Sequence, residues 1–255
     1  MIKVNGDIVS LEKFGDGTLK CNEVCAGEKN WISWIYDDDS ELFALWCIVN
    51  DIKRYDPFAK ILLQMPYIPN ARQDRRVSGR IFTMKYFADM INAMGFSEVH
   101  VLDPHSDVSM ALIDRSVEMK EDSAMLTAHC MRYDAIMFPD AGAAKKYNVD
   151  DKDIIIGNKK RNADGRVESY DIIGFKNGIK SVAIRDDICS YGGTFAAAAF
   201  ELRKRGVEEI ALVVTHCENN IVKGGAINYM NTVMTTDTIC AVEHPKINIL
   251  KRYRR

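Results

Sequence analysis

Apolar and polar positions alternate along this chain with two different periods, and the alternation predicts strands separated by helices. Between the apolar runs, hydrophobic residues recur every three or four positions, most clearly at residues 41–55, which we expect to form a helix. Apolar runs of strand length lie at residues 31–36, 60–66, 98–103, 134–138, 154–156, 170–175 and 209–215, with weaker candidates at 239–242 and 247–250. Alternation of this kind favours parallel sheets flanked by helices, the α/β class.

Local signals predict where these elements begin and end. Ser40 precedes the first helical pattern and is a good N-cap residue. A second helical pattern covers residues 80–94, and Gly95 follows it in the position expected just after a helix C-terminus. Residues 67–79 read as a polar, arginine-rich loop, and residues 139–142 as a turn.

The length of 255 residues is sufficient for one large domain or two small ones. The strand–helix pattern runs through the chain without a repeat or a low-complexity segment. We therefore expect two α/β domains, an N-terminal one of residues 1–140 and a C-terminal one of residues 141–255.

Composition and charge exclude several classes of protein. Hydrophobic content is 47% and charged content 27%, which is ordinary for a globular protein. The net charge of -2 provides no field that would favour nucleic acid or an anionic membrane, and we interpret the basic segment 251–255 as a solvated C-terminus. No apolar run approaches the ~20 residues that span a bilayer, and no signal peptide is recognisable. Seven scattered cysteines without CxxC pairs indicate free thiols in a reducing cytoplasm.

Residues 182–200 carry the strongest chemical signal. They combine a buried strand, two adjacent carboxylates, a loop of small residues and an alanine-rich helix. A loop at a helix N-terminus offers unpaired backbone N–H groups and the positive end of the helix dipole to an anion. Asp186 and Asp187 lie at the strand end, where open α/β sheets bind their ligands. Hydroxyls for the carboxylates and a phosphate for the loop together suggest a sugar phosphate.

Other polar groups also follow predicted strands. They are residues 72–76, Asp103 with His105, Asp140, and residues 159–161. Because the carboxyl ends of parallel strands share one edge of a sheet, we expect these groups to converge. Each group alone also fits a solvated loop or turn, or a surface histidine. The phosphate-binding GxxxxGK[ST] motif and the dinucleotide GxGxxG motif are both absent.

The segment MPYIPNARQDRR at residues 65–76 closely resembles the PYxxYARQDR signature of ribose-phosphate pyrophosphokinases, the PRPP synthetases. Further resemblances follow in the same order over residues 14–238, nearly the whole chain. They are FGDG at 14–17 to FxDGE, DPH at 103–105 to DLH, PDAG at 139–142 to SPDxG, KKR at 159–161 to the KRR of the catalytic flexible loop, and DDICSYGGT at 186–194 to DDxxDTGGT. The resemblance implies a pair of similar phosphoribosyltransferase-type α/β domains, with ATP on the N-terminal side and ribose phosphate on the C-terminal side.

The implied reaction transfers the β,γ-diphosphoryl group of ATP to the anomeric hydroxyl of a ribose 5-phosphate and releases AMP. Such transfer depends on positioning and charge neutralisation, so it requires Mg²⁺ and cationic side chains. By resemblance, Lys159 and Arg161 are catalytic, and His105 and Asp140 bind Mg²⁺. The resemblance assigns ATP binding to Arg72, Gln73, Asp74 and His105, with Phe14 and Asp16 reaching the adenine from a neighbouring subunit. It assigns the ribose hydroxyls to Asp186 and Asp187, and the 5-phosphate to Ser190, Tyr191, Gly192, Gly193 and Thr194. A homo-oligomer, either dimer or hexamer, is also implied.

The chain departs from the family pattern in two places. Ser190 and Tyr191 stand where the family has aspartate and threonine, and Thr18 stands where FxDGE has glutamate. An aromatic ring at the phosphate loop can stack on a base, so the acceptor is either ribose 5-phosphate or a larger molecule such as ADP-ribose. The second choice would yield ADP-ribose 1-diphosphate and suit NAD salvage by a compact, phage-type member of the family.

Two other classes stay open. A phosphoribosyltransferase would share the loop at residues 186–194 but has no reason to carry ARQDR or the 159–161 segment. A catalytically silent regulatory relative would retain the fold and lose metal or lysine positions. His105, Asp140 and Lys159 are all present, which favours an active enzyme.

Overall fold

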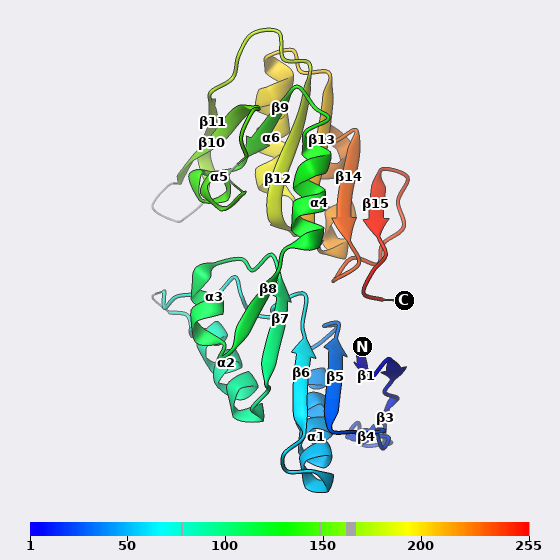
Figure 1. The fold of residues 1–255 in the computed structure, drawn as a ribbon. Helices are drawn as coiled ribbons and strands as arrows, with labels where there is room; N and C mark the ends of the chain where they lie inside the picture. The colour runs from blue at the N-terminus through cyan, green and yellow to red at the C-terminus, as the bar shows by residue number, and fades with distance from the viewer. Residues whose placement is uncertain (78, 148, 162–166, 255) are drawn as a thin grey trace. The chain divides into compact units, whose positions relative to one another are not determined.

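The computed structural model describes residues 1–77, 79–147, 149–161 and 167–254, without the side chains of 159–161 and 167–169. The chain forms two compact units, Met1–Lys120 and Glu121–Arg255 (Figure 1). The predicted boundary at residue 140 lies inside the second unit, after strand β9 (Ala135–Phe138). Helix α4 (Glu121–Cys130) packs on strands of this unit, and β9 pairs with two of them, so both elements belong to it.

The first unit is built on a six-stranded sheet with the order β2-β1-β5-β6-β7-β8 (Figure 1). Strands β5 to β8 are parallel, and β1 pairs antiparallel with both of its neighbours. The bounds are β1 Ile2–Val4, β2 Asp7–Ile8, β5 Lys29–Trp34, β6 Lys60–Gln64, β7 Glu98–Leu102 and β8 Ser116–Met119. A separate hairpin consists of β3 (Leu11–Lys13) and β4 (Leu19–Cys21).

Three helices connect the consecutive parallel strands of the first unit. They are α1 (Ser40–Tyr55), α2 (Thr83–Met94) and α3 (Asp107–Leu112). Successive right-handed crossovers to the next strand place such helices on the same face of a sheet. The buried residues follow this rule, because Ile32 of β5 shares a hydrophobic core with residues of α1 and α2, whereas the neighbouring Trp31 is 38% exposed.

The second unit is built on a seven-stranded sheet with the order β11-β10-β9-β12-β13-β14-β15. All pairs are parallel except β10 with β11. The remaining bounds are β10 Asp153–Arg161, β11 Val167–Ile173, β12 Ser181–Cys189, β13 Glu209–Cys217, β14 Thr232–Thr236, β15 Ile247–Leu250, α5 Ala141–Tyr147, α6 Gly193–Lys204, the 3₁₀ helix η1 Asn219–Lys223 and α7 Ala226–Tyr229.

Helices cover both faces of the second sheet (Figure 1). Consecutive residues of β12 show this, because side chains alternate between the faces of a strand. Ile184 shares one hydrophobic core with Leu202 of α6. Ala183 shares the other with Leu126 of α4 and Ala143 of α5. The second unit therefore has a helical layer on each side of its sheet.

Several predicted element boundaries were wrong in detail. Residues 139–142 are not a simple turn, because α5 begins at Ala141 and the Asp140 carboxylate accepts a hydrogen bond from the Ala143 amide at 3.1 Å. Residues 239–242 form no strand; the strand lies earlier, at β14, where threonines mask the apolar signal. The C-terminal signal at Gly95 is confirmed, since this residue caps α2 with a left-handed φ of 65°.

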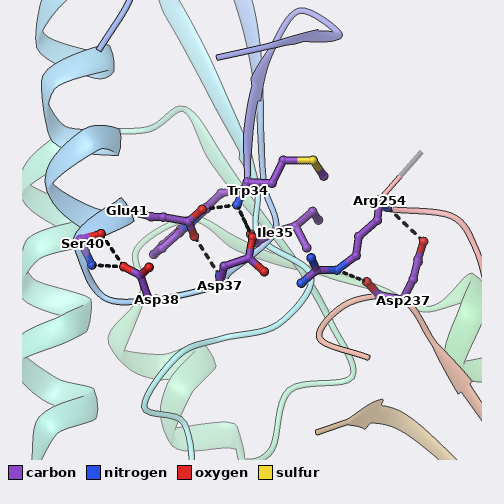
Figure 2. Close-up of polar contacts among 9 residues, drawn as sticks. Trp34, Ile35, Asp37, Asp38, Ser40, Glu41, Asp237 and Arg254 are labelled. Atoms are coloured by element: carbon purple, nitrogen blue, oxygen red, sulfur yellow. Dashed lines mark hydrogen bonds and ion pairs between the residues drawn. The ribbon is translucent and has the colours of Figure 1, made fainter. Parts of the chain in front are cut away.

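The first turn of α1 is fixed by two carboxylates, as Figure 2 shows. Ser40 is the first helical residue, and its amide and hydroxyl both donate to Asp38, so the predicted N-cap role of Ser40 was wrong. Glu41 is buried and accepts hydrogen bonds from the Trp34 indole at 3.0 Å and from the Asp37 amide at 2.9 Å. These contacts join the end of β5 to the start of α1.

The basic C-terminal segment is bound rather than solvated. The buried Asp237 carboxylate accepts hydrogen bonds from the amides of Arg252, Tyr253 and Arg254 at 2.9, 2.9 and 3.0 Å. The Arg254 side chain also donates to the Asp237 carbonyl, and Figure 2 shows the contacts between Arg254 and Asp237. The buried Asp122 of α4 accepts a hydrogen bond from the Tyr253 hydroxyl at 2.6 Å and pairs with Arg252 at 3.0 Å. Two buried carboxylates therefore hold the segment against the second unit.

The seven cysteines are free thiols, as predicted. Burial raises the pKa of Cys130 to about 11, so this thiol stays protonated at neutral pH. Within the described residues, no helix is both long enough and apolar enough to cross a membrane.

Candidate active site

In the second unit, the carboxyl ends of β9 and β12 bring three carboxylates near one another. The two strands are parallel neighbours, with Ile184 opposite Met137; Asp140 follows β9, and Asp186 and Asp187 lie in β12. The pKa of Asp186 lies well above its usual value, chiefly because the carboxyl group is largely withdrawn from water and then because Asp187 and Asp140 add negative charge. The effect of Asp140 and Asp187 on the pKa of Asp186 shows that the three carboxylates are close, which agrees with their predicted convergence.

Tyr170 of β11 extends this carboxylate group and was not predicted. Its hydroxyl donates to the Pro139 carbonyl at 3.4 Å. Burial raises the pKa of Tyr170, and the nearby Asp140 and Asp186 raise it further, so the phenol stays neutral. Sequence pattern alone gives no signal for this residue, because its place depends on the antiparallel pairing of β10 with β11.

The β12–α6 loop consists of Ser190, Tyr191 and Gly192 and joins the strand directly to the helix. Gly192 is the N-cap of α6 and has a left-handed φ of 79°, a conformation that suits glycine. No side chain caps this helix end, so the first amides of α6 and the positive end of its dipole are suited to an anion. Tyr191 is 56% exposed, whereas Gly192 is buried. The loop therefore ends in an open helix N-terminus, and phosphate binding there stays a prediction.

Arg185, which immediately precedes the carboxylate pair, is a second residue that the sequence did not reveal. Its guanidinium is fully buried and stacks on the Tyr147 ring of α5, with 4.0 Å between the guanidinium carbon and the ring centre. Its N–H groups donate to Thr127 Oγ1 at 3.3 Å, Ser123 Oγ at 3.0 Å, Thr215 Oγ1 at 3.1 Å, and the carbonyls of Val213 and Asp186. Arg185 thus connects α4, α5 and β13 to the backbone of Asp186.

In the first unit, the arginine-rich loop follows β6, and His105 follows the neighbouring parallel strand β7. Arg72, Gln73 and His105 are exposed, and Asp74 is partly buried. Gln73 is held in place, because its side-chain oxygen accepts a hydrogen bond from the Thr83 hydroxyl at 2.8 Å. Thr83 begins α2, so the amide of Gln73 is fixed relative to this helix.

Phe14 and Asp16 lie in the turn between β3 and β4. The Phe14 amide donates to the Thr18 carbonyl at 2.9 Å, and the Phe14 ring is 56% exposed. Asp16 accepts hydrogen bonds from the Thr18 hydroxyl at 2.7 Å and the Thr18 amide at 3.0 Å, which lower the pKa of Asp16. Thr18, which stands where the motif has glutamate, therefore closes the turn through its side chain and backbone.

A protein from Marinomonas sp. named ribose-phosphate pyrophosphokinase is 31% identical to this chain over 250 residues, which cover 90% of the chain and 78% of that protein. The chain belongs to the ribose-phosphate pyrophosphokinase family. A relative of the same name from Pasteurella multocida is 28% identical over 96% of the chain and 82% of its own length. No family model matches the chain.

The fold agrees with membership of the ribose-phosphate pyrophosphokinase family. The crystal structure of phosphoribosylpyrophosphate synthetase from Mycobacterium smegmatis matches 95% of this chain and 85% of its own, with a TM-score of 0.76 and 20% identity. The predicted fold class, two phosphoribosyltransferase-type units with parallel sheets flanked by helices, is confirmed. The chain is therefore an enzyme of the diphosphotransferase type that gives the family its name.

The roles that the ribose-phosphate pyrophosphokinase motifs assign to the site residues all stay predictions, and for two groups the structure gives no side-chain geometry. The backbones of Lys159 and Arg161 lie in β10, with Lys159 opposite Tyr170, but their side chains are outside the described residues. The pairing of His105 with Asp140 around Mg²⁺ joins residues of different units.

The donor chemistry of the second unit fits magnesium. The described part of the chain contains no group of three or more His, Cys, Asp or Glu side chains arranged to hold a metal ion. Mg²⁺ prefers carboxylate oxygens and retains most of its waters, so it needs few protein ligands when phosphates are bound. Asp140, the residue of this unit that the motifs assign to Mg²⁺, supplies an oxygen donor of this kind.

Proposed function

We propose that this protein transfers the β,γ-diphosphoryl group of ATP to the anomeric hydroxyl of a ribose that carries a 5-phosphate, and releases AMP. The observation that carries the proposal is the end of β12, where Asp186 and Asp187 stand just before the uncapped N-terminus of α6. Carboxylates accept hydrogen bonds from sugar hydroxyls, and an open helix N-terminus binds phosphate. The match to ribose-phosphate pyrophosphokinases over 90% of the chain supports the same reaction.

On the acceptor side, Asp186 and Asp187 receive the 2- and 3-hydroxyls of the ribose. The amides of Gly193 and Thr194, at the start of α6, bind the 5-phosphate together with the Thr194 hydroxyl. Arg185 holds the backbone of Asp186 from the opposite side of the strand, so the first carboxylate is presented from a rigid position. This arrangement holds the ribose, and with it the anomeric hydroxyl, in one orientation.

On the donor side, Arg72, Gln73 and His105 hold ATP, with Asp74 in the same loop. Phe14 and Asp16 reach the adenine from a neighbouring subunit, so the enzyme works as a homo-oligomer, either dimer or hexamer. The exposed Phe14 ring at the tip of a hairpin suits such a contact.

The charge that develops on the transferred group is stabilised by cations. Lys159 and Arg161 supply side-chain cations, and removing such a group costs several kcal/mol of activation free energy, about 3 kcal/mol for one donor. Magnesium, when bound with ATP through His105 and Asp140, neutralises phosphate oxygens. Both cationic residues belong to strand β10, which pairs with β11.

A larger acceptor, ADP-ribose, is favoured by one observation. Tyr191 of the β12–α6 loop is 56% exposed, and an accessible aromatic ring provides a face on which a base can stack. Stacking of one base contributes about 1–3 kcal/mol. The product would be ADP-ribose 1-diphosphate, an activated intermediate suited to NAD salvage.

The test is to incubate the protein with ATP, Mg²⁺ and either ribose 5-phosphate or ADP-ribose, and to measure AMP and the products by ion-exchange chromatography. Asp186→Asn is the matched inactive variant, and Asp134→Asn, at the opposite end of the neighbouring strand β9, is the control for an arbitrary loss of a carboxylate. AMP formation with ribose 5-phosphate alone would reject the larger acceptor. AMP formation with ADP-ribose alone would establish it, and no AMP with either acceptor would contradict the proposed reaction.

A further inference from the structure

The β12–α6 loop is held along one side by the segment that follows β13, residues 218–226. Strands β12 and β13 are parallel, and their last paired residues are Cys189 and Cys217. Ser190 therefore follows β12 and Glu218 follows β13 at the same level of the sheet. Their side chains lie beside each other where the two strands end. Neither the motif at residues 186–194 nor the roles described above include Glu218.

Glu218 makes two direct connections to the end of β12. Its carboxylate accepts a hydrogen bond from the Ser190 hydroxyl at 2.6 Å, and its amide donates to the Cys189 carbonyl at 2.8 Å. Asn220 donates to the same carboxylate oxygen at 3.2 Å and so fixes its orientation. A hydroxyl–carboxylate bond of this length is in the range of strong, charge-assisted hydrogen bonds. The first residue of the loop is thus bound to the next strand by a carboxylate.

The following loop residues touch the same segment. A Cβ built on Gly224 would overlap the carbonyl oxygen of Tyr191, so the segment approaches the loop backbone as closely as glycine allows. A Cβ on Gly192 would overlap the Cβ of Ala226, which is fully buried. Ile221, which lies between Glu218 and Gly224 in the chain, is also fully buried and anchors the segment in the core. Ser190, Tyr191 and Gly192 are therefore each held by successive parts of one anchored segment.

We propose that Glu218 is a positioning residue for the acceptor, acting through Ser190 to fix the β12–α6 loop in its phosphate-binding conformation; this rests on the proposed function of that loop. The carboxylate does not need to touch the phosphate. It holds Ser190, the residue from which the loop leaves the sheet, and α6 begins three residues later, at Gly193. Without the bond, the loop must be ordered by the ligand, and that cost lowers affinity for the acceptor phosphate.

The test compares Glu218→Ala, Glu218→Gln, Ser190→Ala and the double variant Glu218→Ala/Ser190→Ala with the unchanged protein. Steady-state KM values for ATP and for the preferred acceptor are measured, together with binding of inorganic phosphate and ribose 5-phosphate by calorimetry. Glu208→Gln is the matched control, because Glu208 is an exposed glutamate that pairs with Lys180 near the amino ends of β12 and β13.

We expect Glu218→Ala to raise the acceptor KM by about tenfold or more, as loss of a charge-assisted hydrogen bond predicts, while the KM for ATP stays unchanged. Glu218→Gln retains an oxygen that accepts from Ser190 and should recover part of the loss. The double variant should be no worse than the more affected single variant, because both remove one bond.

Three results would overturn the proposal. They are unchanged acceptor KM and phosphate affinity in both Glu218 variants, equal increases in the KM for ATP and acceptor, and additive effects in the double variant. Failure of the proposed function looks different, since the unchanged protein would then form no AMP with any acceptor. If in that case phosphate still binds more tightly to the unchanged protein than to Glu218→Gln, the positioning role stands; equal affinities, or no phosphate binding at all, reject it.

Discussion

Replacing Arg185 with lysine tests whether the buried guanidinium holds the second unit together. The guanidinium is fully buried and donates to hydroxyls of α4 and β13 and to backbone carbonyls of β12 and β13. A lysine has its donors on a single nitrogen and lacks the planar surface that stacks on Tyr147. It retains the charge but cannot reach α4, β12 and β13 at once.

The expected loss of stability follows from the acceptors that lysine leaves without a donor. Each buried acceptor that loses its partner costs about 1–3 kcal/mol, and loss of the stacking adds about 0.5–1 kcal/mol. Hydroxyl groups such as those of Ser123 and Thr215 can turn toward other acceptors, which reduces their share. We therefore expect Arg185→Lys to destabilise the second unit by about 2–4 kcal/mol.

The assay must report on the second unit itself. Trp31, Trp34 and Trp46, the three tryptophans of the chain, all lie in the first unit, so their fluorescence would miss the effect. Hydrogen exchange followed by mass spectrometry, on peptides from β12 and β13, measures the relevant opening free energy. A change of 2–4 kcal/mol corresponds to roughly 30-fold to 1,000-fold faster exchange of the slowest amides.

The control is Arg132→Lys, an arginine on an exposed loop of the same unit. Surface replacements of this kind change stability by less than about 0.5 kcal/mol. If Arg185→Lys exchanged at the rate of this control, the guanidinium contacts would contribute nothing to stability. Faster exchange confined to the first unit would likewise refute the reasoning.

Two further replacements have distinct expected outcomes. Lys159→Ala should abolish AMP formation and leave the unfolding midpoint unchanged, because the proposed role of this lysine is to stabilise the negative charge that develops in the transition state. Retained activity would reject that role. Tyr253→Phe removes the hydroxyl that donates to the buried Asp122 at 2.6 Å. Hydrogen exchange of the α4 amides should then become faster by an amount that corresponds to about 1–3 kcal/mol. Exchange identical to that of the unchanged protein would show that water replaces the bond.

Most of the fold could be predicted from the sequence because its signals are local. Gly95 ends α2 at the expected residue, and the alternation of apolar runs with helical patterns identified the α/β class. The errors fell where a polar residue takes part in a nonlocal contact. Segment 251–255 looks solvated from its charge, yet Asp237 and Asp122 bind residues 252–254 from positions distant in the sequence. Charge pattern alone contains no information about such partners.

The same limit applies at the candidate site, where the motif positions were predictable and their supports were not. Ser190 stands where the DDxxDTGGT motif has an aspartate, so the sequence alone indicates that the phosphate loop has lost a carboxylate. The structure places a carboxylate beside it, from Glu218, because the parallel register sets Cys189 opposite Cys217. Register between strands depends on the whole sheet, so no window of sequence around residue 190 contains it. A substitution in this loop therefore has to be judged together with residue 218. The exposed Tyr191 is the departure from the motif that bears on the proposed larger acceptor.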